Sequence, residues 1–587
     1  MISPPRPAPS ARSLAVLIVL ALAPLWLSGM FGRGLWTPDE PREADIAWRM
    51  SQQGDRTLPR LAGTPFLEKP PLSYWMSAAA ISLFGDSAAG ARVPNLLYAA
   101  ITALAVGALA LAMQPDAASA LLAALIAASA LTAFRVSTWL APDACLLAGS
   151  ALALLGAWRG YSAPAGRRKA AGYTLMHFGA AIGFMAKSAP GWLVPALALV
   201  ALIVWERRWS ELRRWELYAG LVLQGLVIGP WVLAVARTEH GADALRALFW
   251  NNVVGRFTRV AAPAALDYTT GHHNTAGKYL LELPLYLLPW TFAVAAALCR
   301  AWTGVREAGP SGTAWRFAIA SSLPFLALLS VAATARDIYA APALLGLAVL
   351  TGLWVCGAQR APTRLDQLAV TATRVLAGAL GGALVAALAL LFASGAGAPL
   401  ACLAAALAAA VATLTALTLA TQSQHRGDLQ RSLVWTYTGY AAALCLTALA
   451  ALPVVDRWQD LPGLARRIHA DCARRPLALL DPDETTIAML DHGFDDGFTI
   501  LTTGADVPRG AVSGWLRAHG REARVLVLMP GHGPGPLTRW LERLHAHDPD
   551  GDGIAGSLAA SGTATLLRRY ELPQGRRYAL LGPSPVP

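Results

Sequence analysis

Uninterrupted apolar runs recur along most of this sequence, each about 18 to 24 residues long, which is the length of a helix that crosses a bilayer. Transmembrane β-strands would instead alternate polar and apolar residues over shorter segments. Hydrophobic residues make up 55% of the chain and charged residues only 14%, well outside the range of water-soluble domains. The bilayer is therefore expected to be the main solvent, and the expected fold class is a polytopic all-α membrane protein.

About thirteen segments have the length and composition of a membrane-spanning helix. They cover residues 14–30, 93–113, 117–134, 139–158, 171–186, 189–205, 216–236, 280–299, 316–334, 338–356, 370–393, 399–421 and 433–453. Residues 71–84 are apolar but short for a span, so we expect an interfacial or re-entrant helix there. The first segment follows Arg6 and Arg12, as a secretory signal would, but its long apolar stretch favours an uncleaved span.

Basic residues in the short loops predict the orientation, because cytoplasmic loops are enriched in Lys and Arg. In the expected topology these loops all fall on one side: residues 159–169, 207–214, 300–306, 360–364 and 426–431. The N-terminus is then cytoplasmic and the C-terminal tail lies on the outer, periplasmic side of a bacterial inner membrane. The net charge of +12 follows from this topology, so we expect membrane lipids and not nucleic acid as partners.

The expected domains are a transmembrane domain, residues 1–455, and a soluble periplasmic α/β domain, residues 456–587. Two long periplasmic segments, residues 31–92 and 237–279, interrupt the first domain. In the tail, β-like runs at 477–480, 524–529, 565–570 and 577–581 alternate with helix-like segments at 462–473, 484–491 and 536–546. The cysteines follow no disulfide or metal-binding pattern, so we expect mostly buried thiols.

Charged residues gather in the first long periplasmic segment. It begins Trp36-Thr37-Pro38-Asp39-Glu40-Pro41-Arg42-Glu43 and continues as a helix to about Gln53. Carboxylates complement the positive end of a helix dipole, so helix capping alone is one explanation of the acidic residues. Asp39 and Glu40 are adjacent and cannot both face one site.

A second charged motif, Glu68-Lys69-Pro70-Pro71, precedes the short apolar segment. Its two charged residues alone would be explained by a solvated ion pair. Both motifs together resemble the lipid-carrier-dependent glycosyltransferases of the aminoarabinose transferase and protein O-mannosyltransferase group, which have a GT-C fold. The resemblance covers most of the membrane region.

The resemblance implies catalytic roles for Asp39, at the essential acidic position of the first outer loop, and for Asp143, at a second acidic position. Asp143 begins the fourth expected span, where a carboxylate is costly and so a candidate for function. The implied contacts with the carrier phosphate or its sugar come from Glu40, Arg42, Lys69, Lys187, Arg256, Arg336 and Tyr339. Ser188 follows Lys187 where the family has glycine. A lysine at a helix end whose side chain snorkels to the interface would also explain Lys187. A place in an aromatic belt at the membrane interface would also explain Tyr339.

The resemblance further implies one divalent metal ion, held by Glu68 and His272, with His273 as an equally acceptable ligand. The run of Pro and aromatic residues that follows this histidine in the family is missing, because Asn274-Thr275-Ala276-Gly277 stands there. Two ligands are too few to name an ion, and a solvated histidine pair is the alternative. No nucleotide cofactor is expected.

The chemistry implied by these residues is sugar transfer from a polyprenyl (undecaprenyl) phosphate donor to a lipid or glycan acceptor on the periplasmic side, by single-displacement inversion. Basic side chains would stabilise the charge that the phosphate gains as it leaves, and Asp39 would accept the proton of the acceptor. If the acceptor oxygen belongs to a phosphate, Asp39 would instead orient it or a metal. The sequence names no sugar. The acceptor could be lipid A, another envelope glycan or a protein hydroxyl, and a multi-pass transporter is the alternative class.

Overall fold

The computed structural model of the chain describes residues 10–52, 54, 56–254, 274–275, 277–332, 335–395, 399–492, 494, 497–502, 508–529 and 553–584. The chain divides into two compact units. The helical unit comprises Met1–Gly32, Met50–Pro59 and Phe66–Leu452, and the C-terminal unit comprises Arg33–Arg49, Arg60–Pro65 and Pro453–Pro587. The C-terminal unit thus contains most of the tail expected from the sequence and also two pieces of the first long loop.

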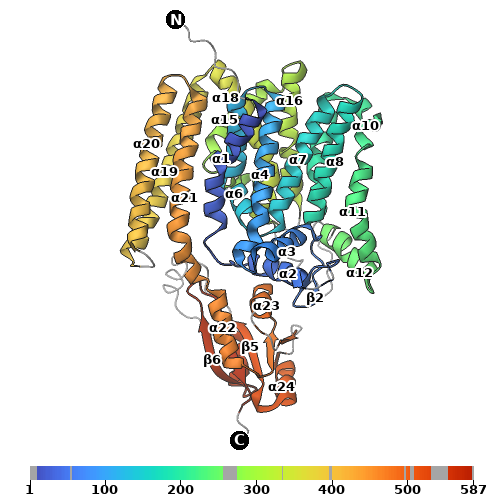
Figure 1. Cartoon of the computed structure of the whole chain (residues 1–587), viewed down its shortest axis with the longest axis vertical. Coiled ribbons are helices and arrows are strands. Elements are labelled where there is room, and N and C mark those ends of the chain that lie inside the picture. Colours follow the sequence, from blue (N-terminus) through green and yellow to red (C-terminus); the bar gives the residue numbers. More distant parts are fainter. Residues whose placement is uncertain are drawn as a thin grey trace. The chain divides into compact units, whose positions relative to one another are not determined.

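Helices make up the whole regular structure of the helical unit within the described residues (Figure 1). They are α1 (Ala11–Met30), α3 (Leu72–Phe84), α4 (Ala88–Met113), α5 (Ala117–Ser129), α6 (Leu131–Thr138), α7 (Pro142–Ser162), α8 (Arg167–Lys187), α9 (Pro190–Glu206), α10 (Trp215–Tyr218), α11 (Leu221–Ala236), α12 (Gly241–Leu245), α14 (Lys278–Tyr286), α15 (Thr291–Gly304), α16 (Gly309–Ala320), α17 (Leu323–Val331), α18 (Ala341–Arg360), α19 (Arg364–Ala393), α20 (Pro399–His425) and α21 (Leu429–Trp458). Short 3₁₀ or π turns lie at η1 (Trp209–Arg213), η2 (Arg246–Val254) and η4 (Asp337–Ala340). Helix α2 (Glu40–Gln52) begins in the C-terminal unit and ends in the helical unit.

Among the described residues, nine helices are long and apolar enough to cross a membrane, or up to eleven if each of two bent pairs counts as one span. By length and composition, up to eleven of the roughly thirteen expected spans are thus found among the described residues. The two remaining expected spans are helices: α8 carries polar residues through its length, and α9 has only 17 residues. The short apolar helix expected at residues 71–84 is present as α3. The chain is a multi-pass membrane protein.

Two spans expected to be continuous are broken. Helices α5 and α6 bend by 66° and α14 and α15 by 120°. The two breaks support each other, because the amide of Leu131 donates to the carbonyl of Leu288 at 2.9 Å and the indole of Trp290 donates to Ser129 at 3.0 Å. Backbone groups released by a break inside a membrane need such partners.

The surface of α19 and α20 is apolar. Leu368 and Val375 on α19, and Leu400 and Leu407 on α20, are each at least 61% exposed. Contiguous apolar surface of this kind is costly in water, so it is explained by contact with lipid tails.

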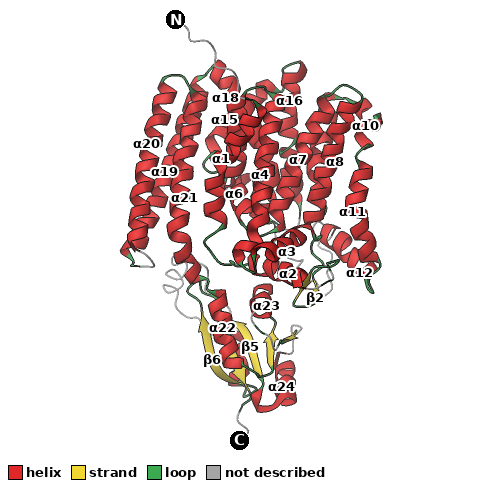
Figure 2. Ribbon diagram, viewed as in Figure 1, coloured by secondary structure: helices red, strands yellow, loops and turns green. Residues whose placement is uncertain are grey.

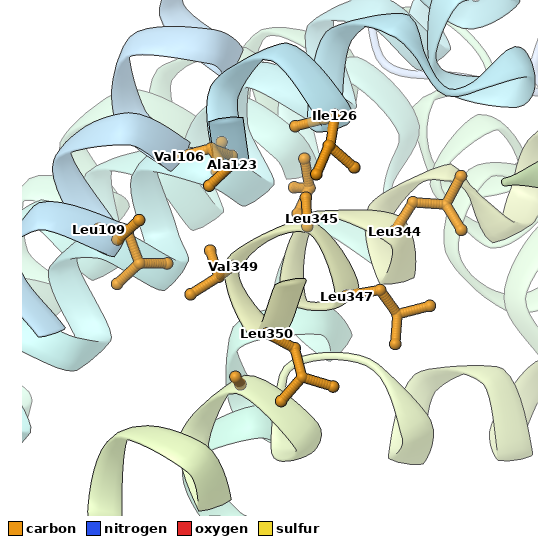
Figure 3. Close-up of a cluster of buried hydrophobic side chains, with 14 of the residues drawn as sticks. Val106, Leu109, Ala123, Ile126, Leu344, Leu345, Leu347, Val349 and Leu350 are labelled. Atoms are coloured by element: carbon orange, nitrogen blue, oxygen red, sulfur yellow. The ribbon is translucent and has the colours of Figure 1, made fainter. Parts of the chain in front are cut away.

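The largest buried cluster of the helical unit surrounds α18 (Figure 3). Leu345 and Val349 of α18 lie in it together with Val106 of α4 and Ile126 of α5. Almost the whole length of α18 is buried, so this helix forms the centre of the unit.

Helices α7 and α8 pack at very short range, and this packing positions two charged residues. A Cβ atom added at Gly149 would lie 2.6 Å from the backbone nitrogen of Gly183, and one added at Gly156 would lie 2.2 Å from that of Met176. Only glycine allows this approach. Since α7 begins where α8 ends, Asp143 and Lys187 are brought to the same end of the pair.

The C-terminal unit contains a five-stranded mixed sheet with the order β4-β3-β5-β7-β6 (Figure 2). Strand β3 is parallel to its neighbours β4 and β5. Strand β7 is antiparallel to its neighbours β5 and β6. The elements are β3 (Leu477–Leu480), β4 (Thr499–Leu501), β5 (Arg524–Met529), β6 (Thr565–Glu571), β7 (Arg577–Gly582), α22 (Leu461–Cys472), α23 (Glu484–Asp491), α24 (Pro508–His519) and α26 (Gly553–Ala560), with a small hairpin of β1 (Arg60–Leu61) and β2 (Thr64–Pro65).

The sequence predicts four of these five strands, and the expected α/β character of the tail is confirmed. Strand β4 was not predicted, because its three residues are largely exposed and carry no pattern. The helix expected at residues 536–546 lies outside the described residues. The expectation of buried thiols is wrong for Cys299, which is exposed on α15.

Candidate functional site

Arg42, in the first turn of α2, joins three carboxylates in the C-terminal unit. Its Nη2 atom lies 3.2 Å from Oδ1 of Asp39 and 2.6 Å from Oε1 of Glu43. Its Nη1 atom donates to Glu484, the first residue of α23. Asp39, Arg42 and Glu43 are buried. The guanidinium group is thus shared between the loop and the tail of the chain.

The loop that carries Asp39 is held by buried polar contacts. Glu40 accepts two hydrogen bonds from Arg33, at 2.5 and 3.0 Å, and one from the amide of Trp36 at 2.9 Å. Asp456 accepts from the amide of Gly34 at 2.8 Å and from the indole of Trp36 at 2.9 Å. Glu40 and Asp39 therefore have different basic partners, as their adjacency in the sequence requires.

In the helical unit, Lys187 connects three elements. Its Nζ atom lies 2.5 Å from Oδ1 of Asp143 and 4.5 Å from the ring centroid of Tyr339. These residues belong to α8, α7 and η4. The structure thus brings together three of the residues predicted from separate motifs.

The segment around Arg336 and Tyr339 is anchored from two sides. The backbone carbonyl of Arg336 accepts from the hydroxyl of Tyr279 at 3.1 Å. Asp337 pairs with Arg135 of α6, and its other carboxylate oxygen accepts from the amide of Ile338 at 2.9 Å. These contacts fix the entrance to α18.

The metal predicted from Glu68 and His272 stays a prediction. One carboxylate oxygen of Glu68 lies 3.8 Å from Nζ of Lys69, as in an ion pair. His272, His273 and the predicted phosphate contact Arg256 lie outside the described residues. Within the described part of the chain, no group of three or more His, Cys, Asp or Glu side chains could hold a metal ion.

Sequence reasoning missed Glu43, Glu484 and a second contact between the loop and the tail. Arg49 of α2 pairs with Asp491 at the end of α23 and lies 3.8 Å from Asp45. Burial and the neighbouring Asp491 carboxylate raise the pKa of Asp45 to about 9. The paired residues are 442 positions apart, so nothing in a single sequence indicates that they meet.

Comparison with known proteins was consistent at three levels. Residues 15–245 match the family "Dolichyl-phosphate-mannose-protein mannosyltransferase". A curated protein of Pseudomonas aeruginosa strain PAO1, named undecaprenyl phosphate-alpha-4-amino-4-deoxy-L-arabinose arabinosyl transferase, is 32% identical over 58% of this chain and 60% of its own length. A protein of the same name from Edwardsiella ictaluri is 31% identical over 58% of this chain and 59% of its own length.

The crystal structure of ArnT from Cupriavidus metallidurans bound to undecaprenyl phosphate superposes with a TM-score of 0.69 at 18% sequence identity, covering 98% of both chains. The two proteins share one fold. The apo structure of the same protein gives a TM-score of 0.68. This likeness confirms the fold class predicted from the sequence, a helical membrane protein with a C-terminal α/β domain. The sequence alignment spans only about three fifths of the curated relatives, 60% in the P. aeruginosa protein.

Proposed function

We propose that this chain is a glycosyltransferase of a bacterial inner membrane, which moves a sugar from polyprenyl (undecaprenyl) phosphate to lipid A or another envelope glycan. The N-terminus is cytoplasmic, and the C-terminal unit and the reaction lie on the periplasmic side. The observation that carries the proposal is the likeness in fold along 98% of the chain to a protein solved with undecaprenyl phosphate. The curated arabinosyl transferases support the same class of donor.

In this proposal the acceptor oxygen attacks the anomeric carbon of the sugar while the bond from that carbon to the phosphate oxygen breaks. Asp39 takes the proton that the acceptor hydroxyl loses. The departing polyprenyl phosphate gains one negative charge, and Lys69, Lys187 and Arg336 stabilise it, with Arg256 as a further candidate. A single displacement inverts the anomeric centre and forms no covalent sugar-enzyme intermediate.

Asp143 contributes through Lys187. At 2.5 Å its carboxylate fixes the Lys187 ammonium, and the ring of Tyr339 limits the space on the other side. A preorganised cation of this kind stabilises developing negative charge without the reorganisation that a mobile lysine would need. If the predicted metal binds, Glu68 and one of the two histidines would hold it, and it would add positive charge near the donor.

A protein hydroxyl is the second candidate acceptor. It is favoured by one observation, the match of residues 15–245 to the protein mannosyltransferase family. The comparisons lend no such support to a transporter.

The proposal is tested by mass spectrometry of envelope lipids and glycoproteins from cells with and without the gene. We expect deletion to remove a sugar from a lipid or glycan, and a plasmid copy to restore it. Loss of a sugar from proteins alone would favour the second acceptor. An unchanged set of glycolipids and glycoproteins would contradict the proposed function.

A further inference from the structure

Within the C-terminal unit, the piece of the first loop that carries Asp39 and the tail of the chain meet along α23. Glu484 at its start binds Arg42, Asp491 at its end binds Arg49, and the rings of Trp48 and His492 lie 4.6 Å apart. The contacts therefore span the whole helix, and the segment that carries Asp39 is fixed against it at more than one point.

Helix α23 is itself tied to the sheet. Asp483 caps its first turn, accepting from the amide of Thr486 at 3.0 Å, and pairs with Arg576. Thr486 also hydrogen-bonds the hydroxyl of Tyr578 on β7 at 3.0 Å. The position of Glu484 is thus held by the sheet, and also by the loop, because the hydroxyl of Thr485 donates to the carbonyl of Pro38 at 3.1 Å.

We propose that Glu484 is a positioning residue of the transfer reaction, which shares the Arg42 guanidinium and so limits the positive charge that Asp39 receives. This inference rests on the proposed role of Asp39 as the base. It gives the tail of the chain, Pro453–Pro587, a part in the reaction.

The geometry of Arg42 makes the sharing effective. A guanidinium group is a rigid planar fork. Nε and Nη2 of Arg42 both donate to Oε1 of Glu43, at 3.2 and 2.6 Å, and Nη1 donates to Glu484, so Glu43 and Glu484 together set its direction. Nη2 then lies closer to Glu43, at 2.6 Å, than to Asp39, at 3.2 Å. Without the charge of Glu484, Asp39 and Glu43 share the positive charge of Arg42 with one carboxylate fewer.

The other charged groups near this cluster have partners of their own. Glu40 binds Arg33, and Asp483 binds Arg576. Asp45 lies 3.8 Å from Arg49 and interacts with Asp491, at the other end of the contact between α2 and α23. Glu43 and Glu484 are two negative charges that share Arg42 with Asp39.

Removing the charge of Glu484 should make Asp39 a weaker base, because a like charge nearby favours proton uptake and a closer cation opposes it. In purified full-length protein supplied with a polyprenyl-phosphate sugar, we expect Glu484→Gln to move the acidic limb of the kcat profile to lower pH, by roughly half to one pH unit. The kcat at its plateau should fall several-fold. Glu484→Asp, which keeps the charge, should restore most of the wild-type profile.

Asp491→Asn is the matched control. It removes a carboxylate from the same helix and breaks an ion pair with the same loop, so a merely structural role would affect both variants alike. We expect the control to keep the wild-type acidic limb. If Glu484→Gln does not fold, Glu484→Ala replaces it, at a side chain that is 26% exposed.

The outcomes separate the two proposals. A wild-type protein that transfers no sugar from any polyprenyl phosphate would overturn the proposed function. An active wild type whose acidic limb is unmoved by either neutral variant, or moved equally by Asp491→Asn, would overturn the role of Glu484.

Discussion

At the scale of single residues, the pair of Asp143 and Lys187 shows how a site is placed by packing elsewhere. Both side chains are largely buried, at 7% and 14% exposure. Their meeting depends on the glycine contacts between α7 and α8, which lie about one to four turns away from the pair. Burying these two charges costs free energy, and the same pair has a proposed function in sugar transfer.

We predict that Asp143→Asn or Lys187→Met alone strongly destabilises the protein, since each leaves one buried charge without its partner, at a cost of about 3 to 5 kcal/mol. The double variant should recover much of this stability but not sugar transfer. Thermal unfolding of the detergent-purified protein provides the measurement. Additive losses in the double variant would show that the two residues are not coupled.

Several residues that the sequence singles out lie side by side in the structure, and short motifs carry them. Asp143, Lys187 and Tyr339 come from three such motifs and meet in the structure. Glu484 could not be found in this way, since its importance comes only from its contact with Arg42 across 442 residues. A single sequence contains no record of such long-range contacts.

At the scale of elements, the contact between α2 and α23 has a predictable dependence on pH. The pKa of Asp45 is raised to about 9, whereas an aspartate in an unfolded chain titrates near about 4. Folding thus takes up a proton between these values. The stabilisation that Asp45 contributes is greatest below about pH 4. As the pH rises, the free energy of unfolding falls by about 1.4 kcal/mol per pH unit, until the pH exceeds the pKa of Asp45 in the folded protein.

Asparagine at position 45 cannot ionise, so we expect Asp45→Asn to remove this dependence of stability on pH. The variant should exceed the wild type in apparent Tm at pH 8 by more than at pH 5. Melting curves of both proteins at these two pH values check the prediction. A difference in Tm that does not change with pH would mean that Asp45 is ionised in the folded protein.

Helix positions were predictable from hydrophobicity, but helix breaks were not. Residues 117–134 and 280–299 read as continuous apolar runs, and the structure bends both. The breaks depend on each other through the bond from Leu131 to Leu288, which is a tertiary contact. Hydrophobicity indicates only that a segment is apolar, and it does not indicate whether the helix bends within that segment.

At the scale of the whole molecule, the orientation inferred from basic loops can be tested by labelling. Exposed Arg517 on α24 and Arg168 on α8 would lie on opposite sides of the membrane. In a background with Cys299→Ser, we expect Arg517→Cys to react with a membrane-impermeant maleimide in spheroplasts. Arg168→Cys should react only after lysis, and the reverse pattern would invert the topology.

The account as a whole depends on Asp39 as the group that accepts the proton in sugar transfer. The direct test is the rate of transfer by purified protein from a polyprenyl-phosphate sugar. Asp39→Asn is compared with the wild type and with Asp45→Asn, the same substitution at a buried neighbour on α2 whose raised pKa, about 9, keeps it protonated at neutral pH. General-base catalysis contributes about 100-fold or more. We therefore predict at least that loss for Asp39→Asn, with little loss for Asp45→Asn. Transfer by Asp39→Asn at the wild-type rate would contradict the account.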